Sequence, residues 1–102
     1  MSLKIQYLKS RPVGKVTFHL PSEAAREATT VHLVGEFNDW DESATPMQRL
    51  RDGSFKATLE LETGHAYRYR YLIDNEKWEN DWDAHRYESS AFAGADDSVV
   101  DV

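Results

Sequence analysis

The 102-residue chain contains no cysteine, so it has neither a disulfide framework nor a thiol nucleophile. It also lacks an apolar run approaching the roughly 20 residues that a membrane-spanning helix needs. The opening Met-Ser-Leu-Lys-Ile is too polar for a signal peptide, and we therefore expect a cytoplasmic protein. Basic charge is scarce: 12 lysines and arginines against 18 acidic residues give a formal net charge of -6. This balance disfavours nucleic acid or an anionic membrane as the main partner and favours a neutral ligand or a basic patch on a protein.

The pattern of apolar residues predicts a single β domain. A chain of 102 residues can bury one hydrophobic core, so we expect one domain over residues 1–102. Strands are predicted where apolar and polar residues alternate, over residues 15–20, 30–36, 55–61, 67–73 and 98–102. Asp52-Gly53 is typical of a hairpin turn, and residues 21–29 are too short and polar for a stable helix. Short strands without a convincing helix predict an all-β fold, an immunoglobulin-like antiparallel β-sandwich.

The strand over residues 30–36 leads into the first candidate for a binding residue. Its alternating pattern breaks at Gly35 and continues as a polar turn that ends in Trp40. An indole presented by such a turn can cover the C–H face of a glucose ring with a large contact area at little entropic cost. Trp40 is therefore a candidate ligand contact, and the alternative is that it closes one end of the β core.

The strand over residues 67–73 has two chemically different faces. Alternation places Tyr67, Tyr69 and Tyr71 on one face and Arg70 on the other. The tyrosines resemble a stacking ladder, but we expect them in the core between the two sheets. Arg70 can donate several hydrogen bonds to the hydroxyl oxygens of a ligand. The alternative is a surface arginine paired with one of the many carboxylates nearby.

Trp78 and Trp82 are four residues apart in a segment that is not helical, so at most one of them is expected to share a surface with Trp40. We favour Trp78 and expect Trp82 to pack under the last loop, with contact to the sugar as the alternative. Asp81, Asp83 and His85 are too few and too irregularly spaced for a metal site. We therefore expect neither a metal nor another cofactor.

Acidic residues in the turns invite comparison with glycosidases, which use two carboxyl groups that flank the scissile bond. The candidates are Asp39, Asp41, Glu42, Glu76, Glu79, Asp81 and Asp83. They are spread over turns of a domain too small to build a walled cleft. We therefore expect that the protein is not an enzyme.

Several motifs together have an order and spacing that is specific, although each is weak alone. They are Val34-Gly-Glu-Phe-Asn-Asp-Trp40, Pro46-Met47, Asp52-Gly-Ser-Phe55, Gly64, Tyr69-Arg-Tyr-Leu-Ile-Asp74, Trp78 with Asn80-Asp81, and Gly94 with Asp97-Ser-Val-Val100. With them the chain resembles the family 48 carbohydrate-binding modules, early-set sandwich domains that precede isoamylases and glycogen branching enzymes. The same module is the glycogen-binding domain in the β subunit of AMP-activated protein kinase. The segment 7–18 is similar to free-standing bacterial proteins that consist of this module alone.

The resemblance implies a site for α-glucan. In glycogen-binding members, two tryptophans, a basic residue on the strand between them and an asparagine near the last strand contact the sugar. By resemblance these positions are Trp40, Trp78, Arg70 and Asp97. Asp97 is a departure, because a carboxylate accepts hydrogen bonds from hydroxyls but lacks the amide donor.

Two further positions complete the expected site. Asn80 is expected as a weaker polar contact, beside Asp97. An aliphatic residue that helps to hold the sugar chain in those members has Phe92 or Ala93 as its counterpart here.

Two functions follow as hypotheses. The first is non-catalytic binding of α-1,4-glucan (glycogen, maltodextrin or a starch-like polymer) by aromatic stacking, with a separate glucan-metabolising enzyme as a possible partner. The second is a protein-interaction module that docks to such an enzyme, in which the tryptophans would be interface hot spots. The first requires Trp40 and Trp78 to lie exposed beside polar groups that include Arg70, whereas the second favours a flatter apolar patch.

Overall fold

The structure is a computed structural model that describes residues 3–89 and 96–102. Its first sheet has four antiparallel strands in the order β1-β2-β5-β4. Their bounds are β1 Leu3–Tyr7, β2 Val13–Leu20, β4 Gln48–Arg49 and β5 Phe55–Glu62. The turn Asp52-Gly53 joins β4 to β5 as predicted, and Gly53 has a φ of 88° that favours glycine.

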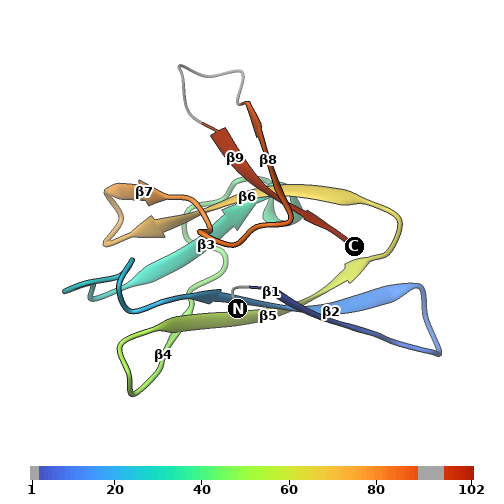
Figure 1. Cartoon of the computed structure of the whole chain (residues 1–102), viewed down its shortest axis with the longest axis horizontal. Helices are drawn as coiled ribbons and strands as arrows, with labels where there is room; N and C mark the ends of the chain where they lie inside the picture. Colours follow the sequence, from blue (N-terminus) through green and yellow to red (C-terminus); the bar gives the residue numbers. More distant parts are fainter. Residues whose placement is uncertain (1–2, 90–95) are drawn as a thin grey trace.

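The second sheet carries the candidate site. It contains β3 (Val31–Gly35), β6 (Ala66–Ile73), β7 (Lys77–Glu79), β8 (Arg86–Ser89) and β9 (Asp96–Asp101). The strand order is β3-β6-β9-β8, and β7 pairs with the end of β6 that β9 does not reach. A short 3-10 helix, η1 (Glu36–Asn38), follows β3 directly. Figure 1 shows the two sheets stacked, with β8 and β9 projecting on the side away from the first sheet.

The core lies between the sheets and is built from the faces that alternation predicted. Phe18 and Leu20 of β2 and Leu33 of β3 are completely buried. Tyr69 and Tyr71 are also completely buried, and the ring of Tyr69 lies 5.0 Å from that of Phe18 in an edge-on arrangement. Two antiparallel sheets around one apolar core confirm the immunoglobulin-like β-sandwich.

The strands predicted from alternation are present with small shifts at their ends, and residues 21–29 form turns. The pattern did not predict β1, β7 and β8, and β4 was implied only by the turn signal Asp52-Gly53. The strands β7 and β8 are short and rich in charged residues, so neither shows an apolar alternation of useful length. In β1, Leu3 and Ile5 do alternate with polar residues, and this signal could have identified it. Phe92 and Ala93, the expected aliphatic contacts, lie outside the described residues.

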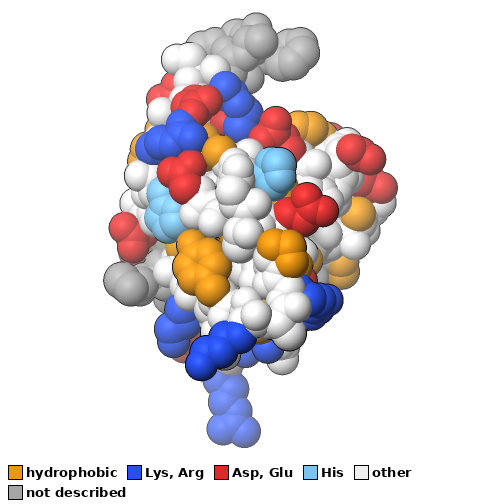
Figure 2. Space-filling model, turned by 90° about the vertical axis from the view of Figure 1, so that its right-hand side faces the viewer, with side chains coloured by type: hydrophobic (Ala, Val, Ile, Leu, Met, Phe, Trp, Pro, Cys, Tyr) orange, Lys and Arg blue, Asp and Glu red, His pale blue; other side chains and the backbone are white. Residues whose placement is uncertain are grey.

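Within residues 3–89 and 96–102 no helix is long and apolar enough to cross a membrane. Figure 2 shows one end of the molecule, where apolar side chains form small separate groups among charged and polar ones.

Candidate functional site

The outer face of the second sheet, directed away from the first sheet, carries Arg70 and Trp78, two of the candidate residues. In the register of the sheet, Leu72 of β6 lies between His32 of β3 and Trp78 of β7. Arg70, two residues before Leu72 on β6, is paired with Val34 of β3. Paired residues of neighbouring strands project to the same side of a sheet. The register therefore places Arg70 and Trp78 on one surface, opposite the buried tyrosines.

Three apolar side chains on this outer face are buried although they do not belong to the core between the sheets. Val34, Leu72 and Val99 are exposed by 0%, 2% and 1%. Since only side chains on the outer face can cover them, this surface is a second packed layer. A closely packed floor holds the polar groups above it in defined positions.

Trp40 is placed by the break at the end of β3. Gly35 is extended, and a Cβ there would lie 2.5 Å from the carbonyl oxygen of Arg68, so only glycine allows this close approach to β6. The side chain of Asn38 then fixes the turn, because it accepts from the Gly35 N–H at 3.1 Å and donates to the Leu33 carbonyl at 2.9 Å. At the end of the turn, the Trp40 N–H donates a hydrogen bond to the Gly35 carbonyl oxygen at 2.9 Å.

The backbone of Trp40 has a φ of 58°, a left-handed conformation that favours glycine. For a residue with a side chain this conformation costs on the order of 1 kcal/mol. The Trp40 side chain is 38% exposed. The turn therefore presents a partly exposed indole on a backbone that favours glycine.

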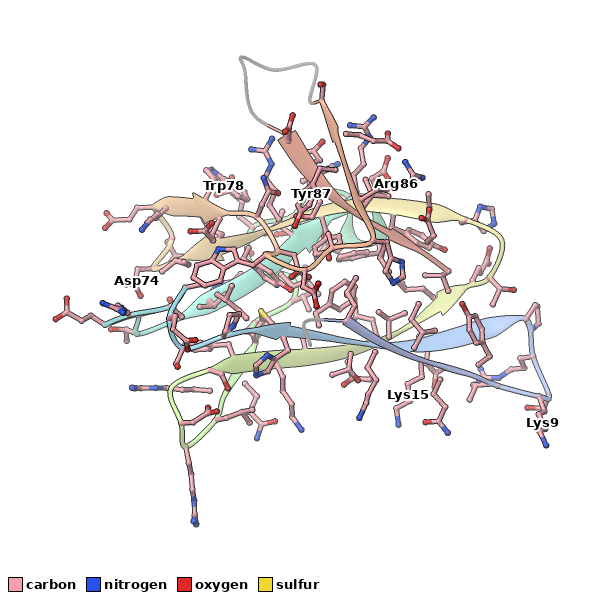
Figure 3. All side chains as sticks on the ribbon, in the orientation of Figure 1. Lys9, Lys15, Asp74, Trp78, Arg86 and Tyr87 are labelled. Carbon is pink, nitrogen blue, oxygen red and sulfur yellow. The ribbon has the colours of Figure 1, made fainter. Side chains whose placement is uncertain are left out.

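Trp78 is brought to the outer face by the hairpin that joins β6 to β7. Asp74 and Asn75, both with positive φ, form the turn, and the Glu76 N–H donates to the Ile73 carbonyl at 3.1 Å. The Asp74 carboxylate also accepts the N–H groups of residues 29 and 30, which lowers the pKa of this carboxyl group. Trp78 is 42% exposed, and Figure 3 shows it on β7 at the side of the molecule formed by the second sheet.

Trp82 corrects one expectation. It was expected to pack under the last loop, but its side chain is 54% exposed, the largest value among the three tryptophans. The buried position in this segment is taken by its neighbour Asp81, which is 1% exposed. The Asp81 carboxylate accepts hydrogen bonds from the hydroxyls of Tyr69 at 2.6 Å and Tyr71 at 3.2 Å. Because Asp81 turns inward to these hydroxyls, Trp82 is left at the surface.

Arg70 is paired with a carboxylate of β9. Its Nε donates to Asp97 Oδ1 at 2.8 Å, and the side chains of Arg70 and Asp97 are 17% and 8% exposed. The other carboxylate oxygen, Oδ2, accepts from Arg68 Nη1 at 3.2 Å. Sequence reasoning missed Arg68, although its place two residues before Arg70 on the same strand was a usable signal.

Asn80 is bonded to β9. Its amide oxygen accepts from the Ser98 N–H at 3.0 Å and from the Ser98 hydroxyl at 2.7 Å, and its amide nitrogen donates to the Asp96 carbonyl at 2.7 Å. The two lone pairs of the amide oxygen are therefore used within the protein. This geometry suits a residue that ties the segment after β7 to β9.

His32 was not selected from the sequence, yet it is half-buried on the outer face in the same row as Trp78. Its Nδ1 is buried and has no hydrogen-bond partner among residues 3–89 and 96–102. A buried polar atom without a partner is unfavourable. No feature of the local sequence distinguishes His32 from the other histidines.

Several carboxyl groups in the turns accept hydrogen bonds that lower their pKa, the direction opposite to the raised pKa that the general acid of a glycosidase needs. In the described part of the chain, every carboxyl group whose pKa clearly departs from its ordinary value has it lowered. The Asp41 carboxylate, for example, accepts from the backbone N–H and the hydroxyl of Ser43, which lowers its pKa.

Comparison with known proteins identifies the family. A family model described as Carbohydrate-binding module 48 (Isoamylase N-terminal domain) matches residues 7–93. The chain belongs to this family. The resemblance stated from the motifs is thereby confirmed, and this carbohydrate-binding module 48 has the sandwich fold expected for it.

The module is also similar to parts of three 1,4-alpha-glucan branching enzymes. It is 42% identical over 60 residues to the enzyme of Aquifex aeolicus, a match that covers 56% of this chain and 9% of the enzyme. The enzyme of Halothermothrix orenii is 36% identical over 50 residues, with 47% and 8% covered. That of Photobacterium profundum is 44% identical over 46 residues, with 44% and 6% covered. The chain therefore matches less than a tenth of the length of each of these relatives.

Proposed function

We propose that the module binds linear α-1,4-glucan without catalysing a reaction, with Trp40 and Trp78 as stacking surfaces and Arg70 as the hydrogen-bond donor. The observation that carries the proposal is the placement of Trp78 and Arg70 on one outer face of a carbohydrate-binding module 48. Both Trp40 and Trp78 are partly exposed, and an exposed indole can stack on a sugar ring. The names of the related branching enzymes favour α-1,4-glucan as the sugar class.

The remaining parts of the hypothesis belong to the same proposal. Asn80 and Asp97 were expected as weaker polar contacts, but their hydrogen bonds within the protein favour a role beneath the sugar chain, where Asn80 holds the segment after β7. We place the module in the cytoplasm, where it would act with a separate glucan-metabolising enzyme. A single site that holds few sugar rings binds weakly, with a dissociation constant on the order of 0.1–1 mM, and several copies on one polymer would bind more tightly.

The test is a titration of the protein with maltoheptaose, followed by tryptophan fluorescence and by calorimetry. Trp40→Ala and Trp78→Ala should each weaken binding by about tenfold or more, the effect of removing an aromatic residue that dominates an interface. Trp82→Ala is the matched control, because it also removes a partly exposed indole. Its binding should equal that of the wild type.

Cellopentaose, with β-linkages, serves as the control ligand and should not bind. If the folded wild type shows no saturable response to maltoheptaose at concentrations of about 10 mM, well above the expected dissociation constant, the proposal is wrong. The docking hypothesis would then be tested by cross-linking the module to a glucan branching enzyme. If Trp82→Ala alone abolished binding, the site would lie on the segment after β7.

A further inference from the structure

We propose that Asp97 is a positioning residue that fixes the guanidinium group of Arg70 and leaves its two terminal nitrogens for sugar hydroxyls. This inference rests on the proposed function and concerns the same site. It differs from what the resemblance implies for this position, which is direct contact with the sugar.

The contacts of the Asp97 carboxylate carry the argument. Its Oδ1 accepts from Arg70 Nε at 2.8 Å, and its Oδ2 accepts from Arg68 Nη1 at 3.2 Å. The side chain is 8% exposed. Both oxygens are thus engaged by arginines of β6, and little of the carboxylate surface is open to a ligand.

A chain of ion pairs holds this arrangement across three strands. Arg68 also donates to Glu88 Oε1 at 2.7 Å and to the Ser89 carbonyl at 3.1 Å, both on β8. Glu88 is in turn paired with Arg86, which donates to Asp101. Three arginines and three carboxylates therefore alternate over β6, β8 and β9, and charge-assisted bonds of this kind have defined geometry.

The consequence for Arg70 is the orientation of its remaining donors. A guanidinium carries five N–H groups. Within residues 3–89 and 96–102, the hydrogen bond of this guanidinium is the Nε contact with Asp97, so the four N–H groups on the two terminal nitrogens have no partner there, and the side chain is 17% exposed. A donor already held in place loses little entropy when a ligand binds. The equal numbers of positive and negative groups also suit a neutral sugar better than an anion.

The first experiment measures the Arg70–Asp97 contact itself, without sugar. In 15N-edited NMR spectra, the Arg70 Nε–H of the wild type should give a signal protected from exchange with water. In Asp97→Asn, where the charge is removed at nearly the same volume, this signal should lose its protection. Glu60→Gln is the matched control, since it removes a carboxylate paired with Arg11 on the first sheet at 3.1 Å. It should leave the Arg70 signal unchanged.

The second experiment measures maltoheptaose affinity in a cycle of variants. Asp97→Asn should weaken binding about tenfold, as coupled neighbouring groups do, whereas Glu60→Gln should bind as the wild type does. In the background of Arg70→Ala, Asp97→Asn should cause no further loss, because a positioning residue acts only through the group that it positions. Far-UV circular dichroism confirms that each variant is folded.

The outcomes separate this inference from the proposed function. If the wild type binds and Asp97→Asn binds equally well or more tightly, Asp97 does not act through its charge on Arg70 and the inference is wrong, while glucan binding stands. If the losses from Asp97→Asn and Arg70→Ala add, Asp97 contacts the sugar directly and the inference is also wrong. If the wild type binds no glucan, both proposals are wrong, whatever the Arg70 signal shows.

Discussion

Replacing Asp81 by alanine tests how the segment after β7 is held on the sandwich. Asp81 is 1% exposed and accepts hydrogen bonds from the hydroxyls of Tyr69 and Tyr71, whose side chains are completely buried. It also accepts the N–H of Asp83 at 3.0 Å. In Asp81→Ala, both tyrosine hydroxyls lose this partner while they remain out of reach of bulk water.

The expected loss follows from these contacts. A buried donor without a partner costs roughly 1–3 kcal/mol, so two of them would cost about 2–6 kcal/mol. The substitution also removes the cost of keeping a carboxylate away from water, so the net loss is smaller than this sum. We therefore expect the free energy of unfolding to fall by about 3 kcal/mol, a large share of the roughly 5–15 kcal/mol typical of a domain.

Urea unfolding followed by circular dichroism measures this change. With a denaturant slope of about 1–3 kcal/mol/M, the midpoint should fall by roughly 1–3 M. Asp83→Ala, two residues further along and exposed, is the matched control and should change stability by less than about 0.5 kcal/mol. Adding Tyr69→Phe and Tyr71→Phe to Asp81→Ala should restore part of the loss, because the unpaired donors are then gone. A loss below about 1 kcal/mol, or no recovery in the triple variant, would refute the reasoning.

Three further predictions concern Gly35, the backbone of Trp40, and the two buried tyrosines. Gly35→Ala should lower stability by about 1–3 kcal/mol in urea unfolding, because its Cβ would lie 2.5 Å from a backbone oxygen; an unchanged midpoint would contradict the packing described. Trp40→Gly should be more stable than Trp40→Ala by about 1 kcal/mol, since φ is 58°, and equal stability would show that the turn is not strained. Burial, followed by the nearby Asp81 carboxylate, raises the pKa of Tyr71, and burial likewise raises that of Tyr69. Above about pH 10 the unfolded chain therefore loses tyrosine protons that the folded chain keeps, so stability should fall as pH rises. Absorbance at 295 nm should show these two tyrosines ionising only with unfolding, and their ionisation in the folded protein would contradict their burial.

Much of the sandwich could be predicted from the sequence, because the governing signals are local. Phe18 and Leu20 alternate with polar residues, and so do Tyr69 and Tyr71, so burying one face of each strand dictates which side chains form the core. The Asp52-Gly53 turn is encoded by two adjacent residues. The family could be recognised for the same reason, since its motifs are short segments at characteristic spacings.

Only the tertiary structure decided how the site is assembled. Arg70 and Asp97 are 27 residues apart, and their contact depends on the pairing of β6 with β9. Trp82 is exposed because Asp81 turns inward to Tyr69 and Tyr71, which lie 12 and 10 residues earlier in the chain. The short strands β7 and β8 form because longer strands beside them supply hydrogen-bond partners. Alternation shows which face a residue occupies, whereas strand register, set by contacts between distant segments, determines which residues meet on that face.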